Sequence, residues 1–201
     1  MYRAMTVIDD FYDDPHEVRR MALGFDYPAP TRHKNFPGLN SRQRLVPQGM
    51  DQILSRILGE PVRGVISEHS THCRFRITLA HHESTNCAHA DPDALYWVGV
   101  IYLTLPEHCQ GGTAFYEHKG LGLDRTPMTH DQLEPYGVDS LEAFQAQEGK
   151  KPENWRHIMT IPMRFNRMIL YRPWNWHSAL PGFGDTPETG RLIQVLACVP
   201  G

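Results

Sequence analysis

The side chains best suited to binding a metal ion are His89 and Asp91, which are separated by one alanine. In an extended segment, residues i and i+2 point to the same face, so an imidazole and a carboxylate can reach one point in space. A third ligand has to come from elsewhere in the chain, and the best candidate is His177 at the end of the segment RPWNWH. Two histidines and one carboxylate on one octahedral face suit Fe(II) and leave three positions open for substrates.

The spacing of His89 and Asp91 is weak evidence by itself. With 12 histidines and 23 acidic residues in 201 positions, chance gives about one His-x-Asp or His-x-Glu match, and a second match does occur at His81 and Glu83. The sequence after His89 distinguishes the first match. It contains, in order, an apolar run with Tyr102, a Gly-Gly turn followed by Thr-x-Phe, the distal His177, and Arg191.

The composition indicates one soluble globular domain that can bury a sizeable core, with 40% hydrophobic and 21% charged residues. A net charge of −3 and the lack of a basic cluster argue against nucleic acid or an anionic membrane as the main partner. The first residues lack the apolar core of a signal peptide, and no apolar run approaches the roughly 20 residues of a membrane span. We therefore expect a cytoplasmic protein. The four cysteines match neither a zinc site nor a CxxC motif, so we expect them in the core.

Apolar periodicity and turn residues predict a chain of short strands with three helices. The predicted helices cover residues 15–23, 48–58 and 139–147, and the predicted strands cover residues 5–8, 62–67, 73–79, 95–105, 114–118, 157–163, 167–171 and 191–199. The strand 114–118 is expected to pair with the strand 95–105, because only a Gly-Gly turn segment separates them. Residues 27–44 are rich in proline and cations and are expected to form a solvated loop, or else a lid over a substrate.

Alternation along two of the predicted strands indicates which side chains share a face. In residues 73–79, one face carries Cys73, Phe75, Ile77 and Leu79, and the other carries Arg74, Arg76 and Thr78. In residues 191–199, one face carries Arg191, Ile193, Val195 and Ala197.

Many short strands preceded by helices predict a mainly β fold of the α+β class, namely a double-stranded β-helix (a jelly roll or cupin-like barrel) with helices packed outside. We expect a single domain over residues 1–201. Within it, residues 1–70 would form a helical and loop buttress, residues 71–120 and 157–201 the barrel, and residues 121–156 an insertion.

The motifs over residues 73 to 199, taken in chain order, resemble those of the Fe(II)/2-oxoglutarate-dependent oxygenase superfamily, on its prolyl-hydroxylase-like branch. The matching segments are His89-Ala90-Asp91, Tyr102-Leu103, Gly111-Gly112-Thr113-Ala114-Phe115, Asn166-Arg167-Met168-Ile169-Leu170-Tyr171, His177 and Arg191.

The resemblance implies that His89, Asp91 and His177 bind Fe(II) and are catalytic. It also implies that Arg191 forms a salt bridge with the distal carboxylate of the cosubstrate 2-oxoglutarate, a task that suits the fork of a guanidinium group. Tyr102 and Thr113 would add hydroxyl hydrogen bonds to that carboxylate. O₂ would be consumed, 2-oxoglutarate would be decarboxylated to succinate, and a substrate C–H bond would be oxidised. The carboxylate of Asp91 favours hydroxylation, desaturation or cyclisation over halogenation, because it occupies the position that a halide would need.

The same residues allow simpler interpretations. His177 could be a core histidine, and Arg191 could pair with Asp185 or Glu188. The whole chain could be a cupin-like metalloenzyme that does not use 2-oxoglutarate, or a ligand-binding barrel with a vestigial metal site. Arg191 and Tyr102 discriminate between these classes, because an enzyme without the cosubstrate has no need of a buried guanidinium beside the metal. The substrate, whether a small molecule or a peptide, and the oligomeric state are left open.

Overall fold

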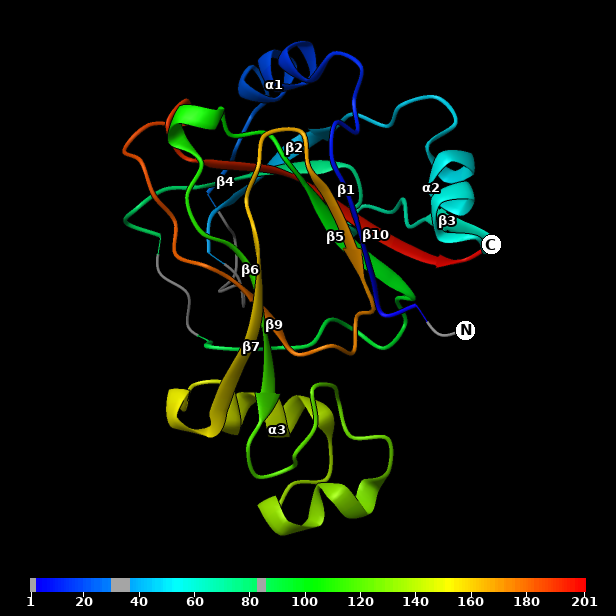
Figure 1. Ribbon diagram of the computed structural model, residues 1–201, viewed down its shortest axis with the longest axis vertical. Coiled ribbons are helices and arrows are strands. Elements are labelled where there is room, and N and C mark those ends of the chain that lie inside the picture. The colour runs from blue at the N-terminus through cyan, green and yellow to red at the C-terminus, as the bar shows by residue number, and fades with distance from the viewer. Residues whose placement is uncertain (1–2, 30–36, 83–85) are drawn as a thin grey trace.

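Two antiparallel β-sheets form the centre of the protein, and helices lie outside them (Figure 1). The computed structural model describes residues 3–29, 37–82 and 86–201. The larger sheet contains, in spatial order, β1 (Met5–Ile8), β8 (Met168–Tyr171), β5 (Trp97–Tyr102), β10 (Arg191–Pro200), β4 (Arg74–Thr78) and β2 (Leu39–Arg44), and β3 (Val62–Gly64) also pairs with β10. The smaller sheet contains β7 (Trp155–Pro162), β6 (Gly112–His118) and β9 (His177–Ala179).

Alternating side chains divide the interior into stacked cores. On β5, Trp97 and Ile101 belong to the core on the outer face of the larger sheet, whereas Val98 and Tyr102 belong to the core between the sheets. This alternation arises because successive side chains of a strand point to opposite faces. The predicted mainly β fold with external helices is confirmed, although the described strands form two facing sheets and do not close into a barrel.

The outer face of the larger sheet is covered by α1 (Pro15–Leu23) and α2 (Met50–Leu58), as predicted. The side chain of Asp14 caps α1 by accepting a hydrogen bond from the backbone N–H of Glu17 (3.0 Å). Gly59, with a φ of 74°, ends α2 in the left-handed conformation that glycine tolerates best. Ala22 of α1 and Leu54 of α2 are fully buried against the sheet.

The segment between β6 and β7 packs on the outer face of the smaller sheet. It contains α3 (Leu141–Glu148) and three short 3₁₀ helices: η2 (His130–Gln132), η3 (Glu134–Tyr136) and η4 (Pro152–Asn154). Phe144 of α3 packs in one aromatic cluster with Trp155 and Trp176. The predicted helix 139–147 is therefore confirmed with a small shift. Among the described residues, no helix has both the length and the apolar character needed to cross a membrane.

Two predictions about strands were wrong. Residues 39–44, which we expected in a loop, form the edge strand β2 on β4, with an irregular register between Asn40 and Arg44. The polar sequence LNSRQR lacks the apolar alternation by which a strand is predicted. An edge strand such as β2 pairs with one neighbouring strand only, so its formation does not depend on that alternation. The cations Arg32, His33 and Lys34 of the same predicted loop lie outside the described residues.

The second wrong prediction concerns β6, which does not pair with β5 and instead belongs to the smaller sheet between β7 and β9. The connection contains the 3₁₀ helix η1 (Pro106–His108) and crosses from one sheet to the other. Gly111, the last residue of the connection, and Gly112, the first residue of β6, have φ values of 64° and 151°. A side chain on Gly112 would also meet the carbonyl oxygen of Ile161 at 2.1 Å, so this crossing requires glycine.

Candidate metal centre

Backbone hydrogen bonds hold His89 and His177 opposite one another. The N–H of each residue donates to the carbonyl oxygen of the other at 2.9 Å, which forms an isolated antiparallel bridge. Two residues further along, the N–H of Asp91 donates to the carbonyl oxygen of Pro173 (2.8 Å). The segment before β5 and the segment that leads into the start of β9 are thereby fixed side by side, although they lie far apart in the sequence.

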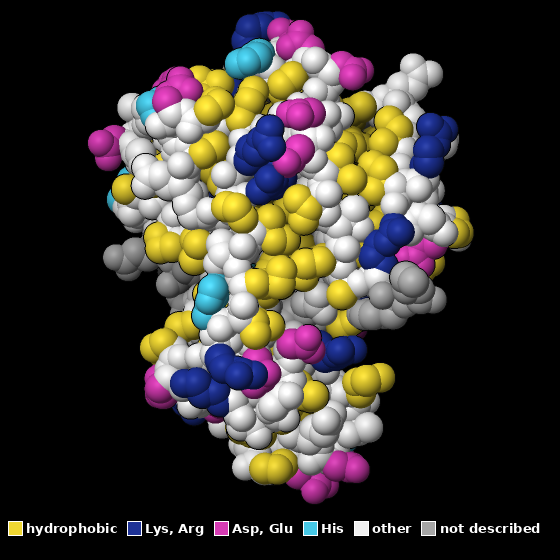
Figure 2. Space-filling view, in the orientation of Figure 1, with side chains coloured by type: hydrophobic (Ala, Val, Ile, Leu, Met, Phe, Trp, Pro, Cys, Tyr) yellow, Lys and Arg dark blue, Asp and Glu magenta, His cyan; other side chains and the backbone are white. Residues whose placement is uncertain are grey.

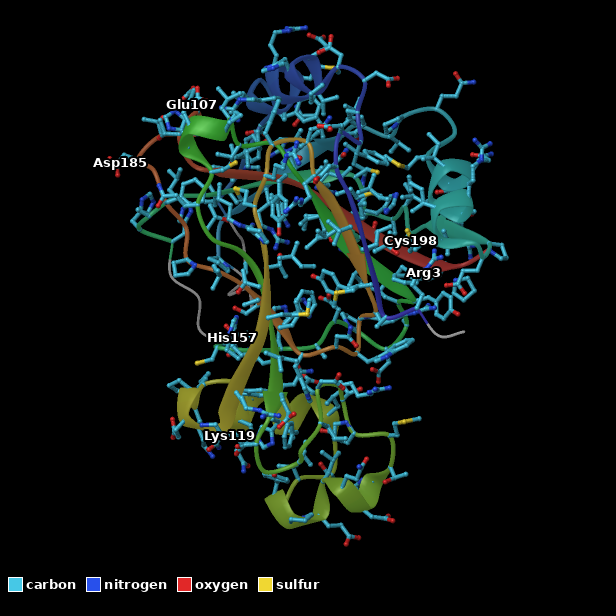
Figure 3. All side chains as sticks on the ribbon, viewed as in Figure 1. Arg3, Glu107, Lys119, His157, Asp185 and Cys198 are labelled. Atoms are coloured by element: carbon cyan, nitrogen blue, oxygen red, sulfur yellow. The ribbon has the colours of Figure 1, made fainter. Side chains whose placement is uncertain are left out.

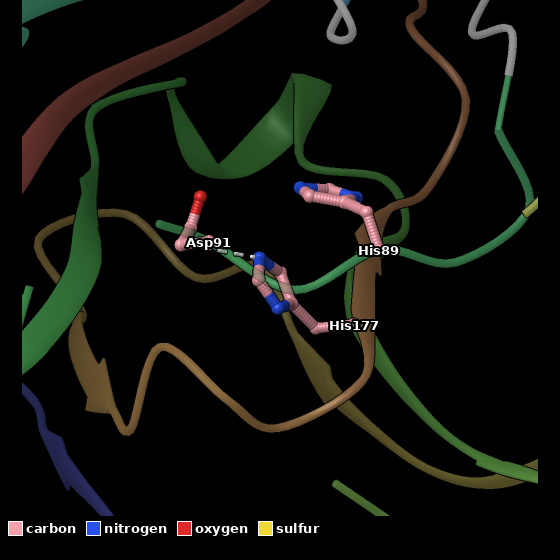
Figure 4. Close-up of side chains that lie close together, drawn as sticks. All are labelled: His89, Asp91 and His177. Carbon is pink, nitrogen blue, oxygen red and sulfur yellow. Dashed lines mark ion pairs between the residues drawn. The ribbon is translucent and has the colours of Figure 1, made fainter. Parts of the chain in front are cut away.

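The three predicted metal ligands converge on one point (Figure 4). One ligand atom from each of His89, Asp91 and His177 lies within 4.8 Å of the others, and the His177 Nε2 to Asp91 Oδ2 distance is 3.4 Å. No other group of three such side chains meets this criterion within the described residues. Two imidazoles and one carboxylate at this separation have the donor types and the closeness that a single Fe(II) ion requires.

The hydrogen bond made by the second ring nitrogen of His177 fixes its tautomer. Nδ1 lies 2.9 Å from the carbonyl oxygen of Asn175, which can only accept, so Nδ1 donates this hydrogen bond and Nε2 is the ring nitrogen on the side of Asp91. Tyr171 packs edge-on against the imidazole ring, with ring centroids 4.6 Å apart. His177 is therefore oriented from two sides.

Burial keeps His89 neutral. It lowers the pKa of His89 well below its ordinary value, and the charges of His177 and Arg76 lower it further. A neutral imidazole is the form that binds a metal ion. The side chain of His177 is only 5% exposed, whereas Asp91 (28%) and His89 are partly exposed, so the centre opens on the side of these two residues.

Arg191 lies on the inner face of the larger sheet, and no carboxylate of the described residues forms an ion pair with it. It is 3% exposed, and its Nε has no hydrogen-bond partner. The two carboxylates that we considered as partners do not fill this role: Asp185 is exposed at the edge of the molecule (Figure 3), and Glu188 forms no ion pair with Arg191. A buried guanidinium with an unused donor fits an anionic ligand.

The two predicted hydroxyl groups meet beside Arg191. The Tyr102 hydroxyl and Thr113 Oγ1 lie 2.7 Å apart, so they join the larger sheet to the smaller one. The guanidinium carbon of Arg191 lies 5.8 Å from the centre of the Tyr102 ring. Burial raises the pKa of Tyr102, although the charge of Arg191 opposes this, and the phenol therefore keeps its proton as a hydrogen-bond donor.

Comparison with known proteins gives a family. The profile described as "Family of unknown function (DUF6445)" matches residues 2–194. The chain belongs to this family. No curated protein matches the sequence.

Solved structures show that the DUF6445 chain has the fold of Fe(II)/2-oxoglutarate-dependent oxygenases, which confirms the resemblance at the level of the fold. It is similar to the non-haem alpha ketoglutarate dependent epimerase SnoN and carbocyclase SnoK, both from nogalamycin biosynthesis, with a TM-score of 0.56 and 13% identity to each. The alignments cover 98% of this chain and 78% of SnoN or 80% of SnoK. It is also similar to HygX from Streptomyces hygroscopicus, solved with nickel, 2-oxoglutarate and hygromycin B, with a TM-score of 0.53, 13% identity, and coverage of 98% and 83%.

Two other arginines of the DUF6445 chain are occupied elsewhere. Arg167 pairs with Asp9 (2.6 Å), and Arg172 pairs with Glu60 (2.8 Å). Of the competing pair His81 and Glu83, Glu83 lies outside the described residues. The neighbouring His82 accepts a hydrogen bond from the backbone N–H of Leu79 through Nδ1 (3.0 Å), which is a structural role in a turn.

A cavity of about 510 Å³ lies beside the metal centre and not at it. Its lining includes Cys87, Tyr116, Trp155, His157 and Ser178, but none of the three predicted ligands. On the face shown in Figure 2, basic and acidic side chains are interspersed, as the near balance of charges in the sequence predicts.

Proposed function

We propose that this protein is a non-haem Fe(II)- and 2-oxoglutarate-dependent dioxygenase that hydroxylates its substrate and converts 2-oxoglutarate to succinate. One observation carries the proposal: the protein combines a His-Asp-His cluster with a buried arginine, Arg191, that forms no ion pair with a carboxylate of the described residues. A metalloenzyme without a dicarboxylate cosubstrate has no use for that arginine, and burying an unpaired cation has a large energetic cost. The fold it shares with SnoN, SnoK and HygX supports the proposal.

Each proposed residue has a distinct task. His89 and His177 would hold Fe(II) through neutral ring nitrogens, and Asp91 would add a charged ligand on the open side. Bound Fe(II) supplies the activation of O₂ and the oxidative decarboxylation of the keto acid. Arg191 would bind the distal carboxylate of 2-oxoglutarate bidentately and so orient the keto end towards the metal. Tyr102 and Thr113 would donate hydroxyl hydrogen bonds to that carboxylate.

The proposed architecture is a double-stranded β-helix over a single domain, in which the two facing sheets are the two halves of the jelly roll. The core between the sheets, with Val100 and Ile169 from one sheet and Phe115 and Ile161 from the other, supports it. We place the enzyme in the cytoplasm and expect a small molecule or a peptide as its substrate, with neither nucleic acid nor membrane as a partner.

The test is anaerobic titration of the purified protein with Fe(II) and then with 2-oxoglutarate, read as the visible charge-transfer absorption of a metal-bound keto acid. We expect the band in the wild type, and we expect metal binding to be lost in His89→Ala and His177→Ala while thermal melting shows a folded protein. His81→Ala is the matched control and should bind metal normally.

The outcomes separate the alternatives. Equal metal content in the wild type and both histidine variants would exclude this metal site. Metal binding without the band would indicate a metalloenzyme that does not use 2-oxoglutarate. With substrate, O₂ and excess chloride, the product should be heavier by one oxygen or lighter by two hydrogens, and a chlorinated product would show that Asp91 is not a ligand.

A further inference from the structure

Tyr171 lies on the inner face of the larger sheet, at the metal centre. It is the last residue of β8 and lies opposite Val98 of β5 in the antiparallel register, and both side chains belong to the core between the sheets. Residues that lie opposite one another in a sheet point to the same face. Tyr102 is on this face as well, but at the other end of β5. Tyr171 therefore enters the space between the sheets from the end opposite to Tyr102.

The ring of Tyr171 crosses to the smaller sheet and packs against a proposed metal ligand. Its centre lies 4.6 Å from that of the His177 ring and 5.2 Å from that of the Phe115 ring, and both contacts are edge-on. Phe115 of β6 is the register partner of His177 on β9. These contacts hold the phenol between the two sheets, in direct contact with the metal centre.

The hydroxyl of Tyr171 has no hydrogen-bond partner among the described residues, although the residue is only 5% exposed. Its oxygen is not among the buried polar atoms that water cannot reach, so it borders accessible space. Other tyrosines have partners: Tyr27 donates to the carbonyl oxygen of Ala22 (2.9 Å), and Tyr102 bonds with Thr113 (2.7 Å). A buried hydroxyl without a partner is unfavourable, so this one is suited to an acceptor that a ligand brings.

The charged groups of the site act on this phenol from two directions. Burial raises the pKa of Tyr171 well above its ordinary value, the charge of Asp91 raises it further, and the charge of Arg191 lowers it. The hydroxyl is therefore within electrostatic range of a proposed metal ligand and of the proposed cosubstrate anchor. A phenol carries its proton at neutral pH even with its ordinary pKa of about 10, so the group is a hydrogen-bond donor.

From these contacts we infer that the Tyr171 hydroxyl donates a hydrogen bond to the keto-acid end of 2-oxoglutarate, which makes Tyr171 a further cosubstrate-binding residue. The inference rests on the proposed function. We assign the keto-acid end because the ring of Tyr171 contacts His177, whereas Arg191 would hold the distal carboxylate. The keto-acid end carries a negative charge, and hydrogen bonds to a charged acceptor are stronger than those to a neutral one. The sequence resemblance includes Tyr171 in a strand motif but gives it no task.

The first measurement is 2-oxoglutarate affinity under anaerobic conditions with Fe(II), for the wild type and Tyr171→Phe. Phenylalanine keeps the ring against His177 and removes only the hydroxyl. We expect 2-oxoglutarate to bind about tenfold more weakly, because one hydrogen bond to a charged group is lost, while the affinity for Fe(II) alone stays unchanged. The matched control is Tyr27→Phe. The hydroxyl of Tyr27 bonds within the outer core, so its loss should leave 2-oxoglutarate affinity unchanged.

The second measurement is the visible spectrum at saturating 2-oxoglutarate. The charge-transfer absorption moves electron density onto the keto acid, and a hydrogen-bond donor at the keto-acid end stabilises that state. Without the hydroxyl, the band of Tyr171→Phe should move to shorter wavelength, whereas Tyr27→Phe should keep the wild-type band.

The melting temperature of the metal-free protein separates ligand binding from structural support. Tyr171→Phe should melt at or above the wild-type temperature, because the free protein loses no hydrogen bond between described residues. Tyr27→Phe should melt at a lower temperature, because the carbonyl oxygen of Ala22 loses its donor.

Each contrary result has its own meaning. Wild-type affinity and an unshifted band in Tyr171→Phe would overturn the inference and keep the proposed function. Weaker binding with an unshifted band would overturn the assignment to the keto-acid end. A lower Fe(II) affinity or a lower melting temperature of Tyr171→Phe would show a structural role and overturn the inference. If the wild type itself neither binds 2-oxoglutarate nor shows the band, the proposed function is rejected, and the inference with it.

Discussion

Arg172 and Arg191 are almost equally buried, at 4% and 3% exposure, but their surroundings are opposite. Arg172 donates to Glu60 at 2.8 Å and lies over the rings of Tyr96 and Trp97, at 4.2 and 3.9 Å from their centres. The carboxylate of Glu60 also accepts hydrogen bonds from those two aromatic side chains. Arg191 has an unused Nε and forms no ion pair with a described carboxylate.

The difference separates a structural cation from one that awaits a ligand. A buried charge is tolerated when a partner and hydrogen bonds replace its lost hydration. Arg172 obtains both from the protein, and it links the residue after β8 to the end of α2. Arg191 has the Tyr102 hydroxyl as a neutral hydrogen-bond partner but no carboxylate among the described residues, so part of the free energy that its burial costs would be recovered when an anion binds.

The largest effect that would test this contrast is expected from Arg191→Leu. Removing one half of a desolvated charge pair costs about 2 to 5 kcal/mol, so 2-oxoglutarate affinity should fall more than tenfold. The melting temperature should stay equal or rise, because leucine removes an uncompensated buried charge. Isothermal titration and thermal melts measure both quantities. Unchanged affinity would show that another group anchors the cosubstrate.

Arg172→Leu should show the reverse behaviour. Breaking the pair leaves the Glu60 carboxylate without its cation and removes two ring contacts, which we expect to destabilise the protein by about 3 kcal/mol. Affinity for 2-oxoglutarate should not change, since Arg172 does not face the metal centre. Denaturant unfolding gives the free energy of unfolding. A loss of cosubstrate affinity without a loss of stability would invalidate the contrast between the two arginines.

The second fully paired buried charge, Glu148, predicts an acid-sensitive stability. Burial raises its pKa, but hydrogen bonds from Lys151, Asn154 and His118 outweigh this and lower it from 4.5 to about 2. Burial also lowers the pKa of His118 from 6.5. In both cases the folded state binds fewer protons than the unfolded state, so stability is complete at higher pH and falls on acidification.

The loss should begin below about pH 6.5 as His118 charges in the unfolded state, and it should continue from pH 4.5 towards pH 2 as Glu148 is protonated, with a contribution on the order of 2 kcal/mol from Glu148. Unfolding measured at a series of pH values checks this, with Glu148→Gln as the control that removes the lower part of the dependence. An identical acid profile for Glu148→Gln would contradict the assignment.

The smallest effect is expected at the hydroxyl pair beside Arg191. Tyr102→Phe should weaken the binding of 2-oxoglutarate by about 1 to 2 kcal/mol, because one hydrogen bond in a buried site is lost. Combining it with Thr113→Val sharpens the comparison. If both hydroxyls donate to the ligand, the two losses add; if they bond only to each other, the double variant is no worse than either single one. Affinities from the same titration decide.

Local features of the fold were predictable from the sequence. Asp14 with Pro15, and Gly59, mark a helix start and a helix end that the structure confirms. Alternation on β10 placed Arg191 and Ile193 on one face, and both lie on the inner side. These features depend on neighbouring residues, so a short stretch of sequence is enough to predict them.

The candidate site was predictable in its residue types and order, but not in its contacts. The motif order named His89, Asp91 and His177, and the structure brings their ligand atoms together. The motif order did not show that His89 and His177 exchange backbone hydrogen bonds. Their metal-binding role is a prediction for experiment.

The sequence by itself determined which side chains could bind a metal, where the main helices lie, and which side chains of a strand share a face. Only the tertiary structure decided that β6 leaves β5 for the other sheet, that the polar segment of β2 forms an edge strand, and that Arg167 and Arg172 have carboxylate partners whereas Arg191 has none among the described residues. The reason is physical. Helix caps and strand alternation follow from the backbone geometry of adjacent residues, whereas strand pairing and the partner of a buried charge depend on segments far apart in the chain, which meet only when the whole core packs.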